Sequence, residues 1–269
     1  ISLARLYREL GRRNNDPEQD NKAEECLKQA MENPKADARV RMTAAAFYRD
    51  IGRPESALRI LQDLVKSTDD PAAKAEYQLE IGSHFLQLKD VAQADAKYLA
   101  AADIKLTETV CVSLGQYFYQ TNRHDRAIEW LERAVTLAEQ AKSPQAARIR
   151  RMEIETLITM GDAKREQAKA KYAELVKNYP DDIDGLRLLA ELEASEGFID
   201  KAIETLTRFL EKRPDDTGSL FRRAQHLGAR GQWQRACADL EKILSTDPAA
   251  IQYRPSMSLA RAYELTDRK

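Results

Sequence analysis

The chain contains two 34-residue stretches that align without a gap, IDGLRLLAELEASEGFIDKAIETLTRFLEKRPDD (183–216) and TGSLFRRAQHLGARGQWQRACADLEKILSTDPAA (217–250). The positions that correspond are Ala190, Gly197, Ala202, Leu206, Phe209 and Pro214 in the first stretch, and Ala224, Gly231, Ala236, Leu240, Ile243 and Pro248 in the second. The apolar positions recur at helical spacing, glycine permits the left-handed turn that ends a helix, and proline stops a helix. Each stretch therefore predicts a helix, a tight turn, a second helix and a break.

Looser copies of this pattern run through the rest of the chain. The alanine that opens each second helix recurs at Ala23, Ala57, Ala94, Ala127, Ala168, Ala202 and Ala236. A large residue follows four positions after each alanine, so every second helix has one apolar stripe. The predicted repeats are 1–37, 38–74, 75–107, 108–143, 144–182, 183–216 and 217–250, with one more first helix in 251–269.

This pattern resembles the tetratricopeptide repeat, because the 34-residue period, the alanine followed by a large apolar residue, and the closing proline are all present. The aromatic residue that the family has at the third mark is Glu193 in one copy and Leu227 in the other. The resemblance implies an all-α fold: a right-handed α-solenoid of stacked antiparallel helical hairpins, with about seven repeats plus an extra first helix, in a single array over 1–269. First helices would line the hollow of this superhelix, and second helices would lie outside.

Three turns depart from the pattern. The polar stretch 12–21 predicts a longer turn in the first repeat, which we interpret as a tolerated surface insertion rather than a contact loop. Asp16 is expected to cap a helix that begins at Pro17, so that part of the insertion lengthens the second helix. Lys89 and Asn122 replace the turn glycine in the third and fourth repeats. Asn tolerates the left-handed conformation, so the second change is conservative.

Composition favours a soluble, helical protein, with 32% charged residues but only 10 Gly and 9 Pro. The net charge of −1 offers no electrostatic footprint for nucleic acid or for an anionic membrane. No apolar run reaches the roughly 18 residues of a membrane span, which argues against direct membrane insertion. The first residue is not Met and a helical pattern is under way at Leu3, so we expect a fragment of a longer chain.

No catalytic, cofactor-binding or metal-binding residues are predicted, so we expect a protein that is not an enzyme. The cysteines and histidines have no spacing typical of a metal site, a disulfide framework or a catalytic relay, and no phosphate-binding glycine loop occurs. Two tryptophans are expected to be partly buried in the stack. These residues are Cys26, Cys111, Cys237, His84, His124, His226, Trp130 and Trp233.

Charge changes sign between two neighbouring segments. Residues 142–171 contain eight basic and four acidic residues, whereas residues 181–204 contain eight acidic and two basic ones. One interpretation is that adjacent hairpins neutralise each other, with each exposed pair worth only about 0–1 kcal/mol. The other is a polarised groove.

The predicted peptide-binding groove is lined by four arginines on three consecutive first helices. Arg148 and Arg151 lie one turn apart, Arg187 and Arg222 take related positions on the next two first helices, and guanidinium groups bind carboxylates bidentately. Glu155 and Glu191 are expected to share the groove and could pair with these arginines instead. The predicted groove residues are Arg148, Arg151, Arg187, Arg222, Tyr119 and Gln116.

Some members of the family clamp a C-terminal carboxylate with asparagine and basic residues. The inward positions expected for repeats two to four do not supply them, which argues against this type of capture. These positions are Thr43, Ala46, Glu80, Ser83, Ser113 and Gln116.

Three hypotheses for function follow. The leading one is a non-catalytic scaffold for protein–protein interaction, which binds a partner protein or peptide segment in its concave groove. The second is a structural spacer that self-associates through open solenoid ends near Leu3 and Tyr263. The third is the interaction domain of a larger enzyme, such as a glycosyltransferase or a kinase.

Overall fold

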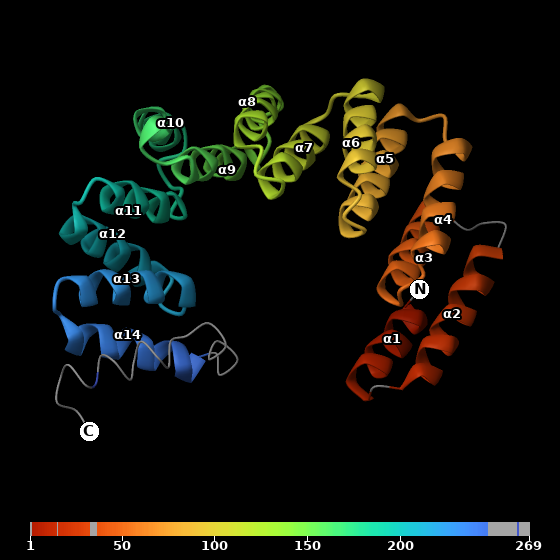
Figure 1. Ribbon diagram of the computed structural model, residues 1–269, viewed down its shortest axis with the longest axis horizontal. Coiled ribbons are helices and arrows are strands. Elements are labelled where there is room, and N and C mark those ends of the chain that lie inside the picture. The colour runs from red at the N-terminus through yellow and green to blue at the C-terminus, as the bar shows by residue number, and fades with distance from the viewer. Residues whose placement is uncertain (1, 15, 33–36, 247–262, 264–269) are drawn as a thin grey trace. The chain divides into compact units, whose positions relative to one another are not determined.

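The protein is described from a computed structural model, which covers residues 2–14, 16–32, 37–246 and 263 (Figure 1). These residues fold into α-helices joined by short turns, and no strand occurs among them. The chain divides into two compact units, Ile1–Tyr117 and Phe118–Lys269. Helices in each unit pack on their neighbours in chain order, which confirms the predicted all-α solenoid of helical hairpins. A single array over 1–269 stays a prediction from the sequence.

The first unit contains three hairpins and most of a seventh helix. The alanines that mark its second helices in the sequence lie inside α2, α4 and α6 and are buried, with exposed fractions of 0% at Ala23, 1% at Ala57 and 0% at Ala94. Small side chains at these points let the paired helices approach closely. The helices are α1 (Ser2–Asn14), α2 (Pro17–Glu32), α3 (Ala38–Asp50), α4 (Pro54–Ser67), α5 (Pro71–Gln87), α6 (Val91–Ile104) and α7 (Glu108–Gln120).

The second unit continues the pattern in the same way. The apolar stripe read from the sequence is buried, with Ala202, Leu206 and Phe209 each at most 1% exposed. Tyr263 is helical and packs against the core of the last hairpin, whereas the rest of the extra helix predicted in 251–269 lies outside the described residues. The elements are α8 (His124–Gln140), α9 (Ala146–Thr159), a 3₁₀ helix (Gly161–Lys164), α10 (Arg165–Asn178), α11 (Gly185–Ser195), α12 (Ile199–Lys212), α13 (Thr217–Ala229) and α14 (Trp233–Thr246).

Five of the hairpin turns that the structure describes share one backbone conformation. Gly52, Gly197 and Gly231 have φ of 73°, 83° and 71°, in the left-handed region that glycine enters without steric cost. Lys89 and Asn122 adopt the same conformation, with φ of 61° and 58°. The turn is thus maintained where its glycine is replaced, as predicted for Asn122.

The prediction of a longer turn in the first repeat is wrong, whereas the predicted lengthening of the second helix from Pro17 is confirmed. Helix α1 continues to Asn14, and α2 begins at Pro17, so most of the polar stretch 12–21 is helical. The Asp16 carboxylate accepts the backbone N–H of Glu18 at 2.9 Å, which confirms the predicted cap. Arginine and glutamate are good helix formers at exposed positions, so the extra residues lengthen the helices rather than the turn.

Both tryptophans lie in the packed stack, as predicted. Trp130 is 9% exposed, and the guanidinium of Arg133 lies 4.5 Å from the centroid of its ring. Trp233 packs against Gly228 so closely that a Cβ at this glycine would lie 2.7 Å from the indole. Packing in the stack therefore accounts for both rings.

Candidate functional site

The candidate site is the arginine face, a name that we give to the four predicted groove arginines of three first helices: Arg148 and Arg151 on α9, Arg187 on α11 and Arg222 on α13. The buried side of α9 is fixed by Ile149 and Ile154, which are 1% and 0% exposed. Arg148 is exposed and Arg151 is half-buried. Arg187 on α11 and Arg222 on α13 are both exposed.

Arg151 is anchored by two carboxylates in the loop before α11. Its guanidinium pairs with Asp182 and, at 3.4 Å, with Asp184. Arg213, which follows α12, lies 3.6 Å from the other oxygen of Asp184. Arg151 therefore joins α9 to the next hairpin, and its charge is largely used inside the protein.

Arg222 is paired across the face. Its guanidinium forms an ion pair with Glu191 on α11. Burial raises the pKa of Glu191 and Arg222 lowers it; Glu155 on α9 raises it further and Arg187 lowers it. Charged groups on α9, α11 and α13 all shift the pKa of Glu191. These three first helices therefore contribute to one electrostatic surface.

Arg148 and Arg187 differ from the other two arginines. Neither guanidinium has a carboxylate within ion-pair distance among the residues that the structure describes. The amide oxygen of Gln145 lies 3.5 Å from Arg148. The arginine face thus has two anchored cations and two that are available to an external anion.

Two further predicted groove residues lie on α7. Gln116 belongs to the first unit and is exposed. Tyr119 belongs to the second unit and is half-buried, with its ring centroid 5.3 Å from that of His124. Their part in a groove stays a prediction.

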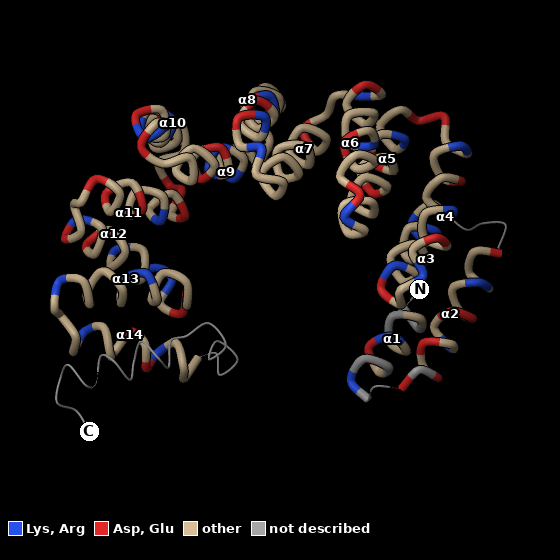
Figure 2. Tube along the Cα trace, in the orientation of Figure 1, with Lys and Arg blue, Asp and Glu red and all other residues tan. Residues whose placement is uncertain are grey.

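The sequence suggested either neutralisation between adjacent hairpins or a polarised groove, and each interpretation accounts for part of the second unit. Neighbouring hairpins do neutralise each other where Arg151 meets Asp182, and where the Lys169 Nζ lies 2.7 Å from the Glu196 carboxylate. Basic and acidic positions are interspersed along α8 to α14 (Figure 2). The positive character of the arginine face therefore depends on Arg148 and Arg187 rather than on the whole segment 142–171.

A buried ion network around Arg150 and Glu153 was not predicted from the sequence. Glu153 on α9 is 0% exposed, and its carboxylate lies 3.0 Å from Arg150 on the same helix and 3.0 Å from Lys171 on α10. Glu139 and Glu174 lie 3.2 Å from the Arg150 guanidinium. Burial raises the pKa of Glu153, and Lys171 and Arg150 oppose this rise. The network joins α8, α9 and α10, with Glu153 and Arg150 buried and the side chains of Glu139 and Glu174 partly exposed at its edge.

The histidines do not converge on a site. His84 is 2% exposed, and burial followed by the charge of Arg49 lowers its pKa. Burial and Arg222 lower the pKa of His226 in the same way. Within the described ranges, no three His, Cys, Asp or Glu side chains are grouped to hold a metal ion. No described helix is both long and apolar enough to cross a membrane.

Comparison with protein families identifies the repeat. Models described as "Tetratricopeptide repeat" match residues 43–105, 109–140, 160–217 and 188–255. These matches cover well over half of the chain. The chain belongs to the tetratricopeptide repeat family. A comparison with curated proteins gave no match.

Solved structures of tetratricopeptide repeat proteins have the same fold. A tetratricopeptide repeat protein from Parabacteroides merdae is 15% identical, with a TM-score of 0.62 over 97% of this chain and 99% of that one. PilF from Pseudomonas aeruginosa is 17% identical, with a TM-score of 0.57 over 82% of this chain and 96% of that one. A chain of the APC/C hetero-tetramer Cut9–Hcn1 is 19% identical, with a TM-score of 0.56 over 90% of this chain. The present chain spans only 46% of that relative.

Family membership and fold together support one general function. Tetratricopeptide repeats are stacked hairpins that present an extended surface, and such surfaces bind other proteins. This tetratricopeptide repeat protein is therefore a protein-interaction scaffold.

Proposed function

We propose that this protein is a non-catalytic scaffold that binds an extended, acidic segment of a partner protein on its arginine face. The observation that carries the proposal is the state of Arg148 and Arg187, which are exposed and lack a carboxylate partner in the described part of the chain. A partner carboxylate can accept two parallel hydrogen bonds from each guanidinium.

The anchored pairs support the same proposal by shaping the surface. Arg151 is held by Asp182 and Asp184, and Arg222 by Glu191, so both guanidinium groups are fixed before a partner arrives. Ordering a long side chain costs about 0.5–1.5 kcal/mol on binding, and a fixed group avoids that cost. The paired carboxylates also disfavour a second acidic residue at these two positions, so the face selects where the negative charges of the segment lie.

The relatives support association with other proteins at the level of the fold. One matched chain comes from the hetero-tetramer Cut9–Hcn1, which is an assembly of different proteins. This is an analogy between folds, and the partner of the present protein is defined by the chemistry of the arginine face.

The test is a binding titration with fluorescent peptides of Asp, Glu, Gly and Ser, against peptides of the same length without charge. The acidic peptide is expected to bind more tightly, and its affinity is expected to fall with added salt because the contacts are exposed. The double substitution Arg148→Glu and Arg187→Glu is expected to weaken binding by about tenfold or more.

The matched control reverses two exposed cations on second helices, Lys177→Glu on α10 and Arg208→Glu on α12. It changes the net charge by the same amount and is expected to leave affinity within about twofold, apart from long-range effects that salt screens. Equal losses in both variants would show that net charge alone attracts the peptide. Loss in the control alone would place binding on the second helices.

A further inference from the structure

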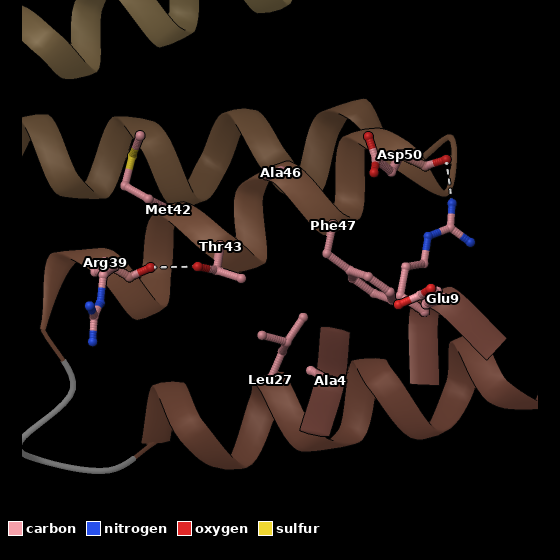
Figure 3. Close-up of a pocket in the computed structure, with 10 residues that line it drawn as sticks. Ala4, Glu9, Leu27, Arg39, Met42, Thr43, Ala46, Phe47 and Asp50 are labelled. Carbon is pink, nitrogen blue, oxygen red and sulfur yellow. Dashed lines mark hydrogen bonds between the residues drawn. The ribbon is translucent and has the colours of Figure 1, made fainter. Parts of the chain in front are cut away.

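A pocket of about 560 Å³ lies in the first unit between the first helices α1 and α3, with α2 beneath it. It is partly open to solvent. Figure 3 shows Ala4 and Leu27 facing Met42, Thr43, Ala46 and Phe47 across this space. Its volume is within the range of about 300–1,000 Å³ that is typical of ligand pockets.

The pocket exists because small residues face each other across the two first helices. Ala4 on α1 and Ala46 on α3 have no side chain beyond Cβ, so neither fills the space. The floor is apolar and buried, with Ala4, Leu27 and Phe47 exposed by 3%, 1% and 7%. The Thr43 hydroxyl donates to the backbone carbonyl of Arg39 at 2.8 Å, so its hydrogen is already used. The space is therefore suited to an apolar group.

One end of the pocket is closed by Arg8. Its guanidinium donates to the Asp20 carboxylate on α2, at 2.8 and 2.9 Å, and to the backbone carbonyl of Asp50 on α3, at 3.0 Å. Glu9 at the same end is paired with Arg13 at 2.7 Å. The charges at this end are thus engaged in contacts within the protein.

The other end carries a cation. Arg39 is exposed, and its guanidinium has no carboxylate within ion-pair distance among the described residues. Figure 3 shows Arg39 at the end of α3 opposite to Asp50 and Glu9. The pocket thus combines an apolar floor with one positive charge, that of Arg39, at the end opposite to Glu9.

We propose that this pocket binds a peptide segment that carries leucine- or methionine-like side chains next to an acidic residue. The apolar side chains occupy the space between α1 and α3, and the acidic residue binds Arg39. A peptide fits better than a fatty acid, because the open part of the pocket would leave part of an acyl chain in water, whereas a peptide presents a polar backbone there. The pocket belongs to the first unit and the arginine face to the second, so this inference stands independently of the proposed function.

The experiment is the selection of a displayed library of random short peptides on the full chain, followed by binding measurements with the selected peptides. The selected sequences are expected to combine Leu, Met or Ile with Asp or Glu. Ala46→Trp fills the pocket and is expected to weaken their binding by about tenfold to a hundredfold, as expected from the burial of one apolar side chain. Arg39→Glu is expected to weaken it by about tenfold or less, in a salt-dependent way.

Two controls distinguish binding in this pocket from binding elsewhere on the protein. Arg59→Glu on α4 reverses an exposed arginine in the same unit and is expected to have no effect, and Arg148→Glu with Arg187→Glu tests the arginine face. Arg39→Glu lies on the surface, so it keeps the test valid if Ala46→Trp lowers the melting temperature. Selected peptides that bind both pocket variants as tightly as the original chain would overturn the proposal. The proposal would also be overturned if a fluorescent fatty acid competed with all selected peptides. It would be overturned equally if the protein formed a dimer that Ala46→Trp dissociates.

Discussion

Substitution of Arg150 by methionine is expected to destabilise the second unit by about 3–5 kcal/mol, because it leaves the buried Glu153 without its neighbouring cation. Glu153 is 0% exposed and Arg150 7%, so water cannot replace the lost partner. Lys171 stays within 3.0 Å of Glu153, but it is shared with Glu132 at 3.2 Å. Chemical denaturation, followed by a probe in the second unit, measures the effect.

Two comparisons define the cause of this loss. Arg148→Met, two residues earlier on the exposed side of α9, is expected to change stability by less than about 0.5 kcal/mol. The double substitution Arg150→Met and Glu153→Leu is expected to recover most of the loss, because apolar replacement of a buried ion pair is often neutral or stabilising. Equal destabilisation by Arg150→Met and Arg148→Met would contradict the buried network.

The loss should also depend on pH. Burial raises the pKa of Glu153, and Arg150 is one of the charges that oppose this rise, so its removal raises the pKa further. A carboxyl whose pKa is higher in the folded state favours the protonated form there, so its contribution to stability decreases as pH rises towards the folded pKa. The penalty of Arg150→Met is therefore expected to be larger at neutral pH than at acidic pH.

Substitution of Gly82 by valine is expected to destabilise the first unit by about 3 kcal/mol, at the upper end of the usual cost of overpacking. A Cβ at Gly82 would lie 2.7 Å from the ring of Tyr98 on α6. Tyr98 cannot move freely, because its ring stacks on Tyr117 with centroids 4.2 Å apart, and the Tyr117 hydroxyl donates to Asp95. One added side chain thus disturbs the contacts of α5, α6 and α7.

The control is Glu76→Val, which places the same side chain at an exposed position of α5. It is expected to cost only the difference in helix propensity, about 0.5 kcal/mol. Thermal unfolding of both variants gives the comparison. Similar melting temperatures would show that α5 and α6 do not approach closely at Gly82.

The fold was predictable because the signal repeats. Ala202, Leu206 and Phe209 recur at the same intervals in other hairpins, and all three are buried. The prediction for the polar stretch 12–21 was only partly correct, because polar composition is shared by turns and by exposed helix ends. The start of the second helix at Pro17 was predicted, but the continuation of α1 to Asn14 was not.

The buried ion network can be recognised in the spacing of residues along α9, although not in the overall composition. Ala146, Arg150, Glu153 and Leu157 follow one another at intervals of four, three and four residues, which is the spacing of one helix side. The outer two are apolar, so the charged pair between them had to lie on the buried side of α9. Charge within an apolar stripe is thus the feature that predicts an internal ion network.

The candidate sites could be predicted only in part. Helical spacing placed Arg148 and Arg187 on exposed sides of their helices, but spacing cannot tell which guanidinium groups find a carboxylate. That depends on the loop that brings Asp182 and Asp184 to Arg151. The pocket in the first unit depends on the separation of α1 and α3, although Thr43 and Ala46 were expected to face inwards and do line it.

Binding on the arginine face is tested most directly by photo-crosslinking of the acidic peptide, with a benzophenone group at its centre, to the unmodified protein. Mass spectrometry of the products then locates the attachment sites. We expect adducts on α9, α11 and α13, which decrease as salt is added. Adducts concentrated on α10, α12 and α14 would contradict it, because the acidic segment would then bind the second helices.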